Sequence, residues 1–240
     1  MSYLLSALAG CGVGVVGTGL GGVAAALIKR VKNRRKTESF LMGLSGGVML
    51  AVVFFELLPE SIRLSGPVMT VIGAVLGAVF VAVLSRLLPS SEGGKDKKLG
   101  MMLFLGIALH NLPEGLAVGA GLNEPDSLGI GLGLLIMMHD VPEGLAMAIP
   151  LKESGMKNPA VILLCAAAGL PTAAGAAIGF AVGGISEAFI AASVAFAGGA
   201  MLILTLAEII PECYKEGGLL SMAFSCAAGF AAGALMGLLV

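Results

Sequence analysis

Charged residues are scarce in this sequence. Asp, Glu, Lys and Arg make up 12% of its 240 residues, whereas a soluble domain carries about 25%. The charges fall in a few clusters, and the stretches between them are apolar for about 20 residues or more, enough to cross ~30 Å of hydrocarbon. Together with a mean hydropathy of +1.01, this excludes a soluble globular protein and indicates a polytopic protein whose main partner is the lipid bilayer. Nothing in the composition suggests a nucleic-acid partner.

Cysteine and histidine are also rare. No CxxC spacing occurs among the four cysteines, which excludes a zinc knuckle and a disulfide framework. We interpret these residues as small apolar side chains, at Cys11, Cys165, Cys213 and Cys226. Only two histidines occur, and the HExxH motif typical of zinc hydrolases is missing.

What the sequence does have is a series of apolar runs separated by charged or turn-forming clusters. They predict an all-α integral membrane fold of eight transmembrane helices in a single domain over residues 1–240. We place the spans at 3–28, 40–58, 67–88, 99–121, 128–150, 159–184, 188–210 and 218–240. The first run has no basic residue before it and is too long for a signal-peptide core, so we expect it to be a span of the mature protein.

The basic residues predict the orientation of these spans. The segment KRVKNRRK between the first two spans carries six of them, and the other loops on that side bring the total to thirteen of the fourteen Lys and Arg residues. Only Arg63 lies on the opposite side. Because cytoplasmic loops carry the excess of Lys and Arg, we expect both termini outside and a multi-pass protein of a bacterial plasma (inner) membrane.

A polar phrase containing proline occurs twice in the middle of this apolar chain. HNLPEGLAVG at 110–119 returns as HDVPEGLAMA at 139–148, and the two histidines open the two copies. In a helix, residues i and i+4 share a face, so His110 lies beside Glu114 and His139 beside Glu143. Both histidines lie about eleven residues into their spans, or ~16 Å deep. Imidazoles and carboxylates can therefore meet near the bilayer midplane.

Ionised groups at that depth need compensation. Placing one ionised side chain near the bilayer centre costs roughly 2.5–3.5 kcal/mol. Asn111 and Asp140 add further polar groups to the same region. A bound divalent cation would offset this cost. Imidazole nitrogen with carboxylate oxygen suits Zn²⁺ and also Fe²⁺, Mn²⁺ or Cd²⁺. Pro113 and Pro142 each free a backbone carbonyl and predict broken helices that line a wet cavity. The simpler alternative is a pair of buried His–Glu hydrogen bonds that hold two helices together.

A second repeat relates residues 46–60, GGVMLAVVFFELLPE, to residues 198–212, GGAMLILTLAEIIPE. Under the predicted orientation the two segments cross the membrane in opposite senses. This indicates an inverted 3+2+3 repeat, with spans 1–3 set against spans 6–8 and spans 4 and 5 as the central pair. Such repeats build transporters far more often than enzymes.

The repeat also places carboxylates near both membrane surfaces. Glu56 lies near the outer end of span 2, where it suits the attraction of cations, and Glu208 lies near the inner end of span 7, where it suits their exit. Glu60 and Glu212 are equally well explained as interfacial residues without a role in transport.

HNLPEG and HDVPEG resemble the motif pair of the ZIP (Zrt-, Irt-like) family of divalent metal transporters. The eight spans, the outside termini and the inverted repeat are similar too, so the resemblance covers essentially the whole chain. It implies that metal binds at the centre of the pathway and moves toward the cytoplasm. A homodimer is suggested by the resemblance alone. The metal-site roles that it implies belong to His110, Asn111, Glu114, His139, Asp140, Glu143, to Met49 as a soft neighbour, and to Glu208 at the inner exit.

Two departures from the family pattern narrow what the resemblance implies. The segment PSSEGGKDKK between spans 3 and 4 has no histidine, so we do not expect metal capture by that loop. Some bacterial relatives complete a second, bridging metal site with a glutamate in span 6, where this chain has Thr172 and no carboxylate. A single site is therefore the simpler expectation, although the shared Glu114, Asp140 and Glu143 leave two metals open.

The sequence thus predicts a transporter that carries Zn²⁺, or Fe²⁺, Mn²⁺ or Cd²⁺, into the cytoplasm, with no catalytic cofactor. The alternative is an intramembrane metalloenzyme with a His/Glu-bound zinc, which would need an HExxH-like base or an open coordination position facing a substrate groove. The four-residue spacing from His to Glu also differs from the ExxH motif of di-iron proteins. A metal-stabilised structural protein would leave the inverted repeat and the terminal carboxylates without a use.

Overall fold

The computed structural model describes residues 3–28, 34–87, 94–122, 128–182 and 187–238, and all regular secondary structure in these ranges is helical. The elements are α1 Tyr3–Leu27, α2 Arg34–Val52, the π-helical turn η2 Val53–Leu57, α3 Leu58–Leu87, α4 Gly94–Gly121, α5 Leu128–Glu153, α6 Asn158–Ala168, α7 Leu170–Val182, α8 Glu187–Leu204, the π-helical turn η3 Thr205–Ile209, and α9 Ile210–Gly237.

Long apolar helices dominate the chain, as its composition predicts. Five helical stretches among the described residues are long and apolar enough to cross a membrane: Leu4–Leu27, Lys36–Leu87, Gly94–Gly121, Asn158–Ala181 and Ala191–Gly237. Large apolar side chains such as Val68, Val71 and Leu76 are exposed along α3, which suits a surface that faces lipid rather than water. The chain is an α-helical, multi-pass membrane protein.

Two of these stretches reverse direction at a glycine. Gly66 in α3 has φ 79° and ψ 168°, and Gly218 in α9 has φ 75° and ψ 171°. Only glycine adopts this backbone region readily, so each break depends on its glycine. The breaks lie beside the starts predicted for spans 3 and 8, at residues 67 and 218.

One predicted span is not a continuous helix. The sequence predicts an unbroken span over 159–184, but α6 ends at Ala168 and α7 begins at Leu170. Pro171 has no N–H to donate to the preceding turn, and Gly169 packs so closely on Gly14 of α1 that a Cβ would collide with its carbonyl group. The break therefore has both a local and a tertiary cause.

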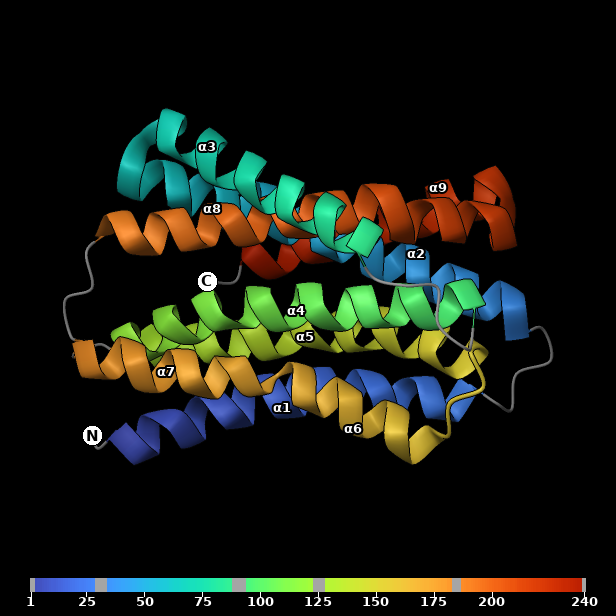
Figure 1. Cartoon of the computed structure of the whole chain (residues 1–240), viewed down its shortest axis with the longest axis horizontal. Coiled ribbons are helices and arrows are strands. Elements are labelled where there is room, and N and C mark those ends of the chain that lie inside the picture. The colour runs from blue at the N-terminus through green and yellow to red at the C-terminus, as the bar shows by residue number, and fades with distance from the viewer. Residues whose placement is uncertain (1–2, 29–33, 88–93, 123–127, 183–186, 239–240) are drawn as a thin grey trace.

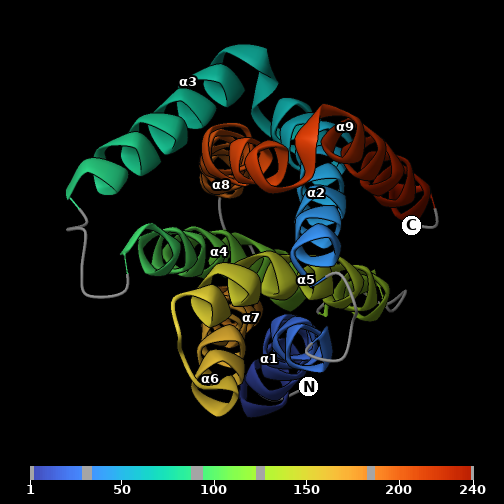
Figure 2. The same cartoon turned by 90° about the vertical axis from the view of Figure 1, so that its right-hand side faces the viewer.

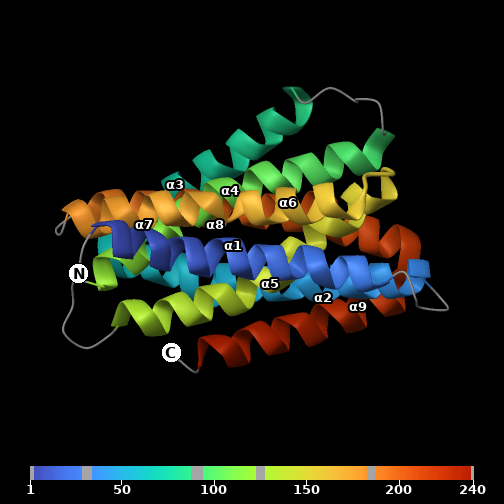
Figure 3. The same ribbon diagram turned by 90° about the horizontal axis from the view of Figure 1, so that it is seen from below.

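The helices form two bundles, which Figures 1 and 2 show one above the other. The lower bundle contains α1, α4, α5, α6 and α7, with α1 packed on α5 and α4 on α7; the upper bundle contains α2, α3, α8 and α9, with α2 packed on α9 and α3 on α8. The start of α1 and the end of α9 lie toward the same side of the molecule in Figures 1 and 3.

The two helix pairs of the upper bundle make the same contact twice. A Cβ at Gly47 of α2 would collide with the Cys226 carbonyl of α9, and a Cβ at Gly199 of α8 would collide with the Ala74 carbonyl of α3. Gly199 and Cys226 follow Gly47 and Ala74 by the same 152 positions that separate the repeated segments. Glycine at such points lets helix backbones approach closely, so the repeat extends from the sequence to the packing.

Candidate metal centre

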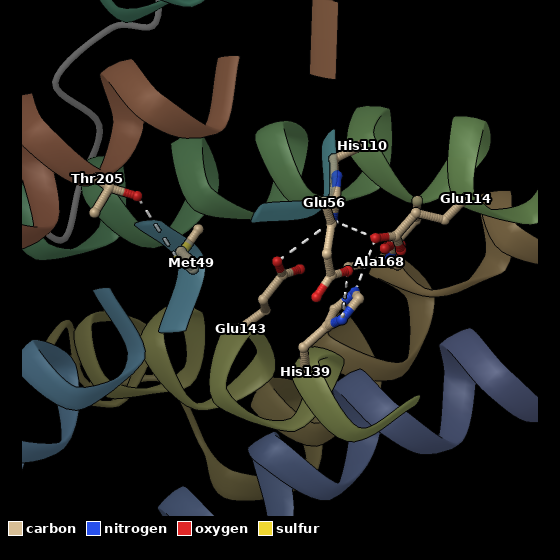
Figure 4. A network of polar contacts seen from close by, with 9 residues as sticks. Met49, Glu56, His110, Glu114, His139, Glu143, Ala168 and Thr205 are labelled. Atoms are coloured by element: carbon tan, nitrogen blue, oxygen red, sulfur yellow. Dashed lines mark hydrogen bonds and ion pairs between the residues drawn. The ribbon is translucent and has the colours of Figure 1, made fainter. Parts of the chain in front are cut away.

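The two copies of the histidine phrase lie on α4 and α5, which run side by side through the middle of the molecule (Figure 1). In α4 the Nε2 atom of His110 lies 3.0 Å from Oε1 of Glu114, as the i, i+4 spacing predicts. The same Glu114 oxygen lies 2.8 Å from Nε2 of His139 on α5. Glu114 thus bridges the two histidines, and Figure 4 shows its carboxylate between the two rings.

Glu143 completes the group from the α5 side. Its Oε1 lies 3.4 Å from Nε2 of His110, so each helix supplies a glutamate to the histidine of the other. The ring centroids of His110 and His139 are 6.3 Å apart. All four side chains are buried, with at most 6% of their surface exposed.

Several polar atoms of this cluster have no hydrogen-bond partner among the described residues. They include Nδ1 of both His110 and His139, Oε2 of Glu114, and both carboxylate oxygens of Glu143 and Asp140; the 3.4 Å contact of Glu143 has an ion-pair distance without hydrogen-bond angles. An unsatisfied buried polar group costs about 1–3 kcal/mol. A cation between the two helices would satisfy several of these groups at once.

The helix break predicted in α4 and α5 lies in a neighbouring element instead. Both helices continue through Pro113 and Pro142, so the expected broken helices are wrong at these positions. The interruption beside the cluster is the one between α6 and α7, where Asn111 donates from Nδ2 to the Ala168 carbonyl over 2.8 Å. A single proline within a helix removes only one hydrogen bond, so the helix can continue. Gly169 and Pro171 together end helix α6.

Glu56 reaches the cluster from the upper bundle. It is the fourth residue of η2, and its Oε2 lies 4.0 Å from Nδ1 of His139. A pocket of about 160 Å³ connects the two, and it is lined by Glu56, Leu57, Glu60, Pro113, Glu114, Ala117, Ile136, His139 and Val194. The sequence places Glu56 only at the mouth of a pathway, whereas the structure places it beside the histidines.

Three of these residues have the geometry to hold one metal ion. His110, Glu114 and His139 each offer a ligand atom, and the three atoms lie within 4.8 Å of one another. Two imidazole nitrogens and one carboxylate oxygen suit Zn²⁺, and three protein ligands leave a coordination position open. Closed structural zinc sites use four protein ligands, so this set of three suits an ion that binds reversibly.

A family model described as ZIP zinc transporter matches residues 89–240, which include both histidine motifs. The chain belongs to the ZIP family. The resemblance carried by HNLPEG and HDVPEG is therefore confirmed.

This chain spans about half the length of the curated relatives that it matches. The zinc transporter ZupT of Corynebacterium glutamicum is 36% identical over 137 residues, which cover 45% of this chain and 50% of that protein. ZupT of Streptococcus mutans is 29% identical over 138 residues, covering 48% of this chain and 50% of that protein. The zinc transporter GufA of Myxococcus xanthus is 34% identical over 154 residues, which cover 60% of this chain and 61% of that protein.

The remaining predicted site residues of this ZIP chain lie beside the histidine cluster or apart from it. Met49 is buried, and its sulfur accepts a hydrogen bond from Thr205 over 3.9 Å, a pair that Figure 4 shows apart from the histidines. Asp140 faces α1, where a Cβ on Gly17 would meet its side chain. Glu208 lines a separate pocket of about 240 Å³, together with Ser85, Lys95, Asp96, Lys98, Leu99, Met102 and Glu212.

The sequence analysis of this ZIP chain underrated Glu56, which the structure places 4.0 Å from His139. The signal for Glu56 was present in the repeat, which pairs it with Glu208. What the sequence could not show is the π-helical turn over Val53–Leu57. Such a turn inserts one residue into the helix and changes which side chains face the neighbouring bundle.

Proposed function

We propose that this ZIP protein transports Zn²⁺, or a related divalent ion such as Fe²⁺, Mn²⁺ or Cd²⁺, across the bacterial plasma (inner) membrane into the cytoplasm. The observation that carries this proposal is the buried set of His110, Glu114 and His139, contributed by two antiparallel helices and within 4.8 Å of one another. ZupT and GufA, which match this chain over 45–60% of its length, are named zinc transporters. Metal is the transported substrate, and the proposal includes no catalytic cofactor and no enzymatic step.

The proposed topology has eight spans in an inverted 3+2+3 arrangement with both termini outside. The reversals at Gly66 and Gly218 support it, because each divides a helical stretch too long for a single crossing into two. The repeated Gly47 and Gly199 contacts support the inverted arrangement. The concentration of Lys and Arg in one set of loops supports the orientation.

The proposed pathway begins at Glu56 and ends at Glu208. The pocket that joins Glu56 to His139 and Glu114 gives an ion a route from one end of the molecule to the cluster. At the opposite end Glu208 lines its own pocket. We infer that the lower bundle moves against the upper bundle to connect the cluster to each end in turn, because the histidines belong to one bundle and Glu56 and Glu208 to the other.

The ligand set of the proposed site is His110, Glu114 and His139, and Glu143, Asp140 and Asn111 are neighbours that shape it. Asn111 is held by the Ala168 carbonyl and fixes the start of the α4 motif against the α6–α7 break. One metal is the simpler occupancy. Thr172 is buried, and its hydroxyl has no hydrogen-bond partner among the described residues, but it adds no carboxylate for a second ion.

The test is metal uptake into proteoliposomes that contain the wild-type protein or the His110→Ala/His139→Ala variant, with Zn²⁺, Fe²⁺, Mn²⁺ and Cd²⁺ compared. Saturable uptake that the double variant lacks would establish the cluster as the transport site and would rank the metals. Tight metal binding by a correctly folded wild-type protein without any flux would overturn the proposal. Equal flux in both proteins would move the transport site elsewhere.

A further inference from the structure

The segment that contains Glu56 occurs twice in the structure as well as in the sequence. α2 is followed by the π-helical turn η2, and α8 is followed by the π-helical turn η3, each five residues long with a glutamate in the fourth position. Those glutamates are Glu56 and Glu208, which are 152 positions apart. Two π-helical turns at equivalent positions are not accidental, because such turns are rare and are frequently found at functional sites.

The surroundings of the two turns repeat too. One turn of helix further on, Arg63 pairs with Glu60 at 2.6 Å, and Lys215 pairs with Glu212 at 2.7 Å. α2 contacts α5 in the lower bundle, and α8 contacts α4. The symmetry that exchanges α2 with α8 therefore also exchanges α5 with α4, and His139 with His110.

The two histidines differ in what faces their Nδ1 atoms. The Nε2 atoms of both rings face the same Glu114 oxygen, at 3.0 and 2.8 Å, so Nδ1 is the free end of each ring. Nδ1 of His139 has the Glu56 carboxylate 4.0 Å away. Nδ1 of His110 has no hydrogen-bond partner among the described residues, and Glu208, the repeat counterpart of Glu56, lies in the pocket that contains Lys98.

We propose that Glu56 and Glu208 are alternating positioning residues: Glu56 orients His139 through Nδ1 while metal loads from its end, and Glu208 takes the corresponding place beside Nδ1 of His110 when the cluster faces the other end. This inference rests on the proposed transport function. It assigns to each glutamate a role inside the site, which differs from the attraction of ions at a membrane surface.

The chemistry of metal-bound histidine explains why such partners matter. A ligating imidazole almost always donates its other ring N–H to a carboxylate, a carbonyl or water, which fixes the tautomer and makes the ligating nitrogen a stronger donor. At 4.0 Å the Glu56 contact is an ion-pair contact that is still too long for a hydrogen bond, and it shortens when metal occupies Nε2. Removing such a partner typically weakens metal binding about 10–100-fold.

The alternation follows from where the partners are anchored. Both histidines move with the lower bundle, whereas Glu56 and Glu208 belong to the upper bundle on opposite sides of the cluster. A displacement that separates Glu56 from His139 brings Glu208 toward His110, because the repeat relates the two arrangements. Each end of the pathway thereby has its own carboxylate to strengthen the site while that end is open.

The experiment compares zinc influx and efflux in vesicles into which the protein inserts in one orientation, checked by protease access to an affinity tag. Glu56→Gln is expected to raise the KM for loading from the Glu56 end about tenfold and to change the KM from the other end less than about twofold. Glu208→Gln is expected to do the reverse. Glu60→Gln and Glu212→Gln, which remove the matched carboxylates one turn away, are expected to cause smaller shifts at both ends.

The outcomes separate this inference from the transport function on which it rests. Equal changes in both directions for Glu56→Gln and Glu208→Gln, with wild-type flux intact, would overturn the alternation alone. No saturable flux in the wild-type protein would instead overturn the proposed function. Should Glu56→Gln fold poorly, Glu56→Asp keeps the charge at shorter reach, and a KM shift of the same direction and smaller size is expected; an unchanged KM would count against the proposal.

Discussion

The two copies of the repeated segment share seven of their fifteen residues but lie in different surroundings. The described residues that line the pocket at Glu56 include three carboxylates and His139 but neither lysine nor arginine, whereas those that line the pocket at Glu208 include three carboxylates and two lysines. The Glu56 pocket joins the histidine cluster, and the Glu208 pocket is bounded by buried side chains such as Leu99 and Met102.

This difference teaches that partner elements, rather than the repeat, decide what each copy does. Carboxylates beside the histidines attract and hold a cation, as the proposed entrance needs, although Glu60 among them pairs with the exposed Arg63. Lysines beside Glu208 compete with a cation for the same carboxylate, as the proposed exit needs, because an ion that is held too tightly is released slowly. The lysines come from the start of α4 and lie outside the repeated segment.

The strongest test of the comparison removes the group that serves both ends. Glu114→Gln takes away the charge that bridges His110 and His139 and leaves two imidazoles without their shared anion. We expect zinc uptake to fall by about 100-fold or more, since a direct ligand matters at least as much as the partners of ligands. Uptake by proteoliposomes measures the loss, and equilibrium zinc binding in detergent should fall with it; retention of tight binding would contradict a ligand role for Glu114.

A second test asks whether the two halves are equivalent in stability. Gly66→Ala and Gly218→Ala each force a Cβ into a backbone region that only glycine adopts readily, at a cost of about 1–3 kcal/mol. Thermal unfolding in detergent should show similar losses for both variants. Gly12→Ala is the control, because a Cβ there meets no atom within 4 Å and φ is not positive. A loss confined to one of the two reversals would show that only one of them is a required turn.

A third test makes the Glu208 end resemble the Glu56 end. Lys98→Gln removes a positive charge from the Glu208 pocket, so zinc should be held longer there and turnover should slow. For a partly exposed charge this amounts to about 0.2–1 kcal/mol, or roughly a one-and-a-half- to fivefold fall in kcat. Uptake measured at low and at high salt should differ less in the variant than in the wild type, because the charge that salt screens is gone. An increase in kcat would reverse the assignment of the exit.

The smallest expected effect concerns the matched surface ion pairs. Arg63 and Lys215 are more than 60% exposed in their contacts with Glu60 and Glu212, and such pairs contribute about 0–1 kcal/mol. Arg63→Gln and Lys215→Gln should therefore change the unfolding temperature in detergent little and by similar amounts. A large loss for either would show that the pair holds its π-helical turn in place.

Much of the site could be predicted from local spacing. The i, i+4 relation puts His110 beside Glu114 in any α-helix, and the matching depth of the two motifs brings α4 and α5 together at the same level. What spacing does not predict is that Glu114 contacts both histidines while Asp140 turns toward α1. That choice depends on the rotation of two helices about their axes, which is set by close contacts such as Gly144 against Thr18.

The sequence by itself determined the helical membrane fold, the family and the histidine–glutamate pairs, because each follows from short-range patterns: apolar run length, motif identity and helical periodicity. Only the tertiary structure decided that Glu56 joins the cluster, that Glu208 lies with lysines, and that the break near the site falls between α6 and α7. The physical reason is that an extra residue in a π-helical turn and the contact of one backbone with another depend on neighbours far apart in the chain, about which local propensity carries no information.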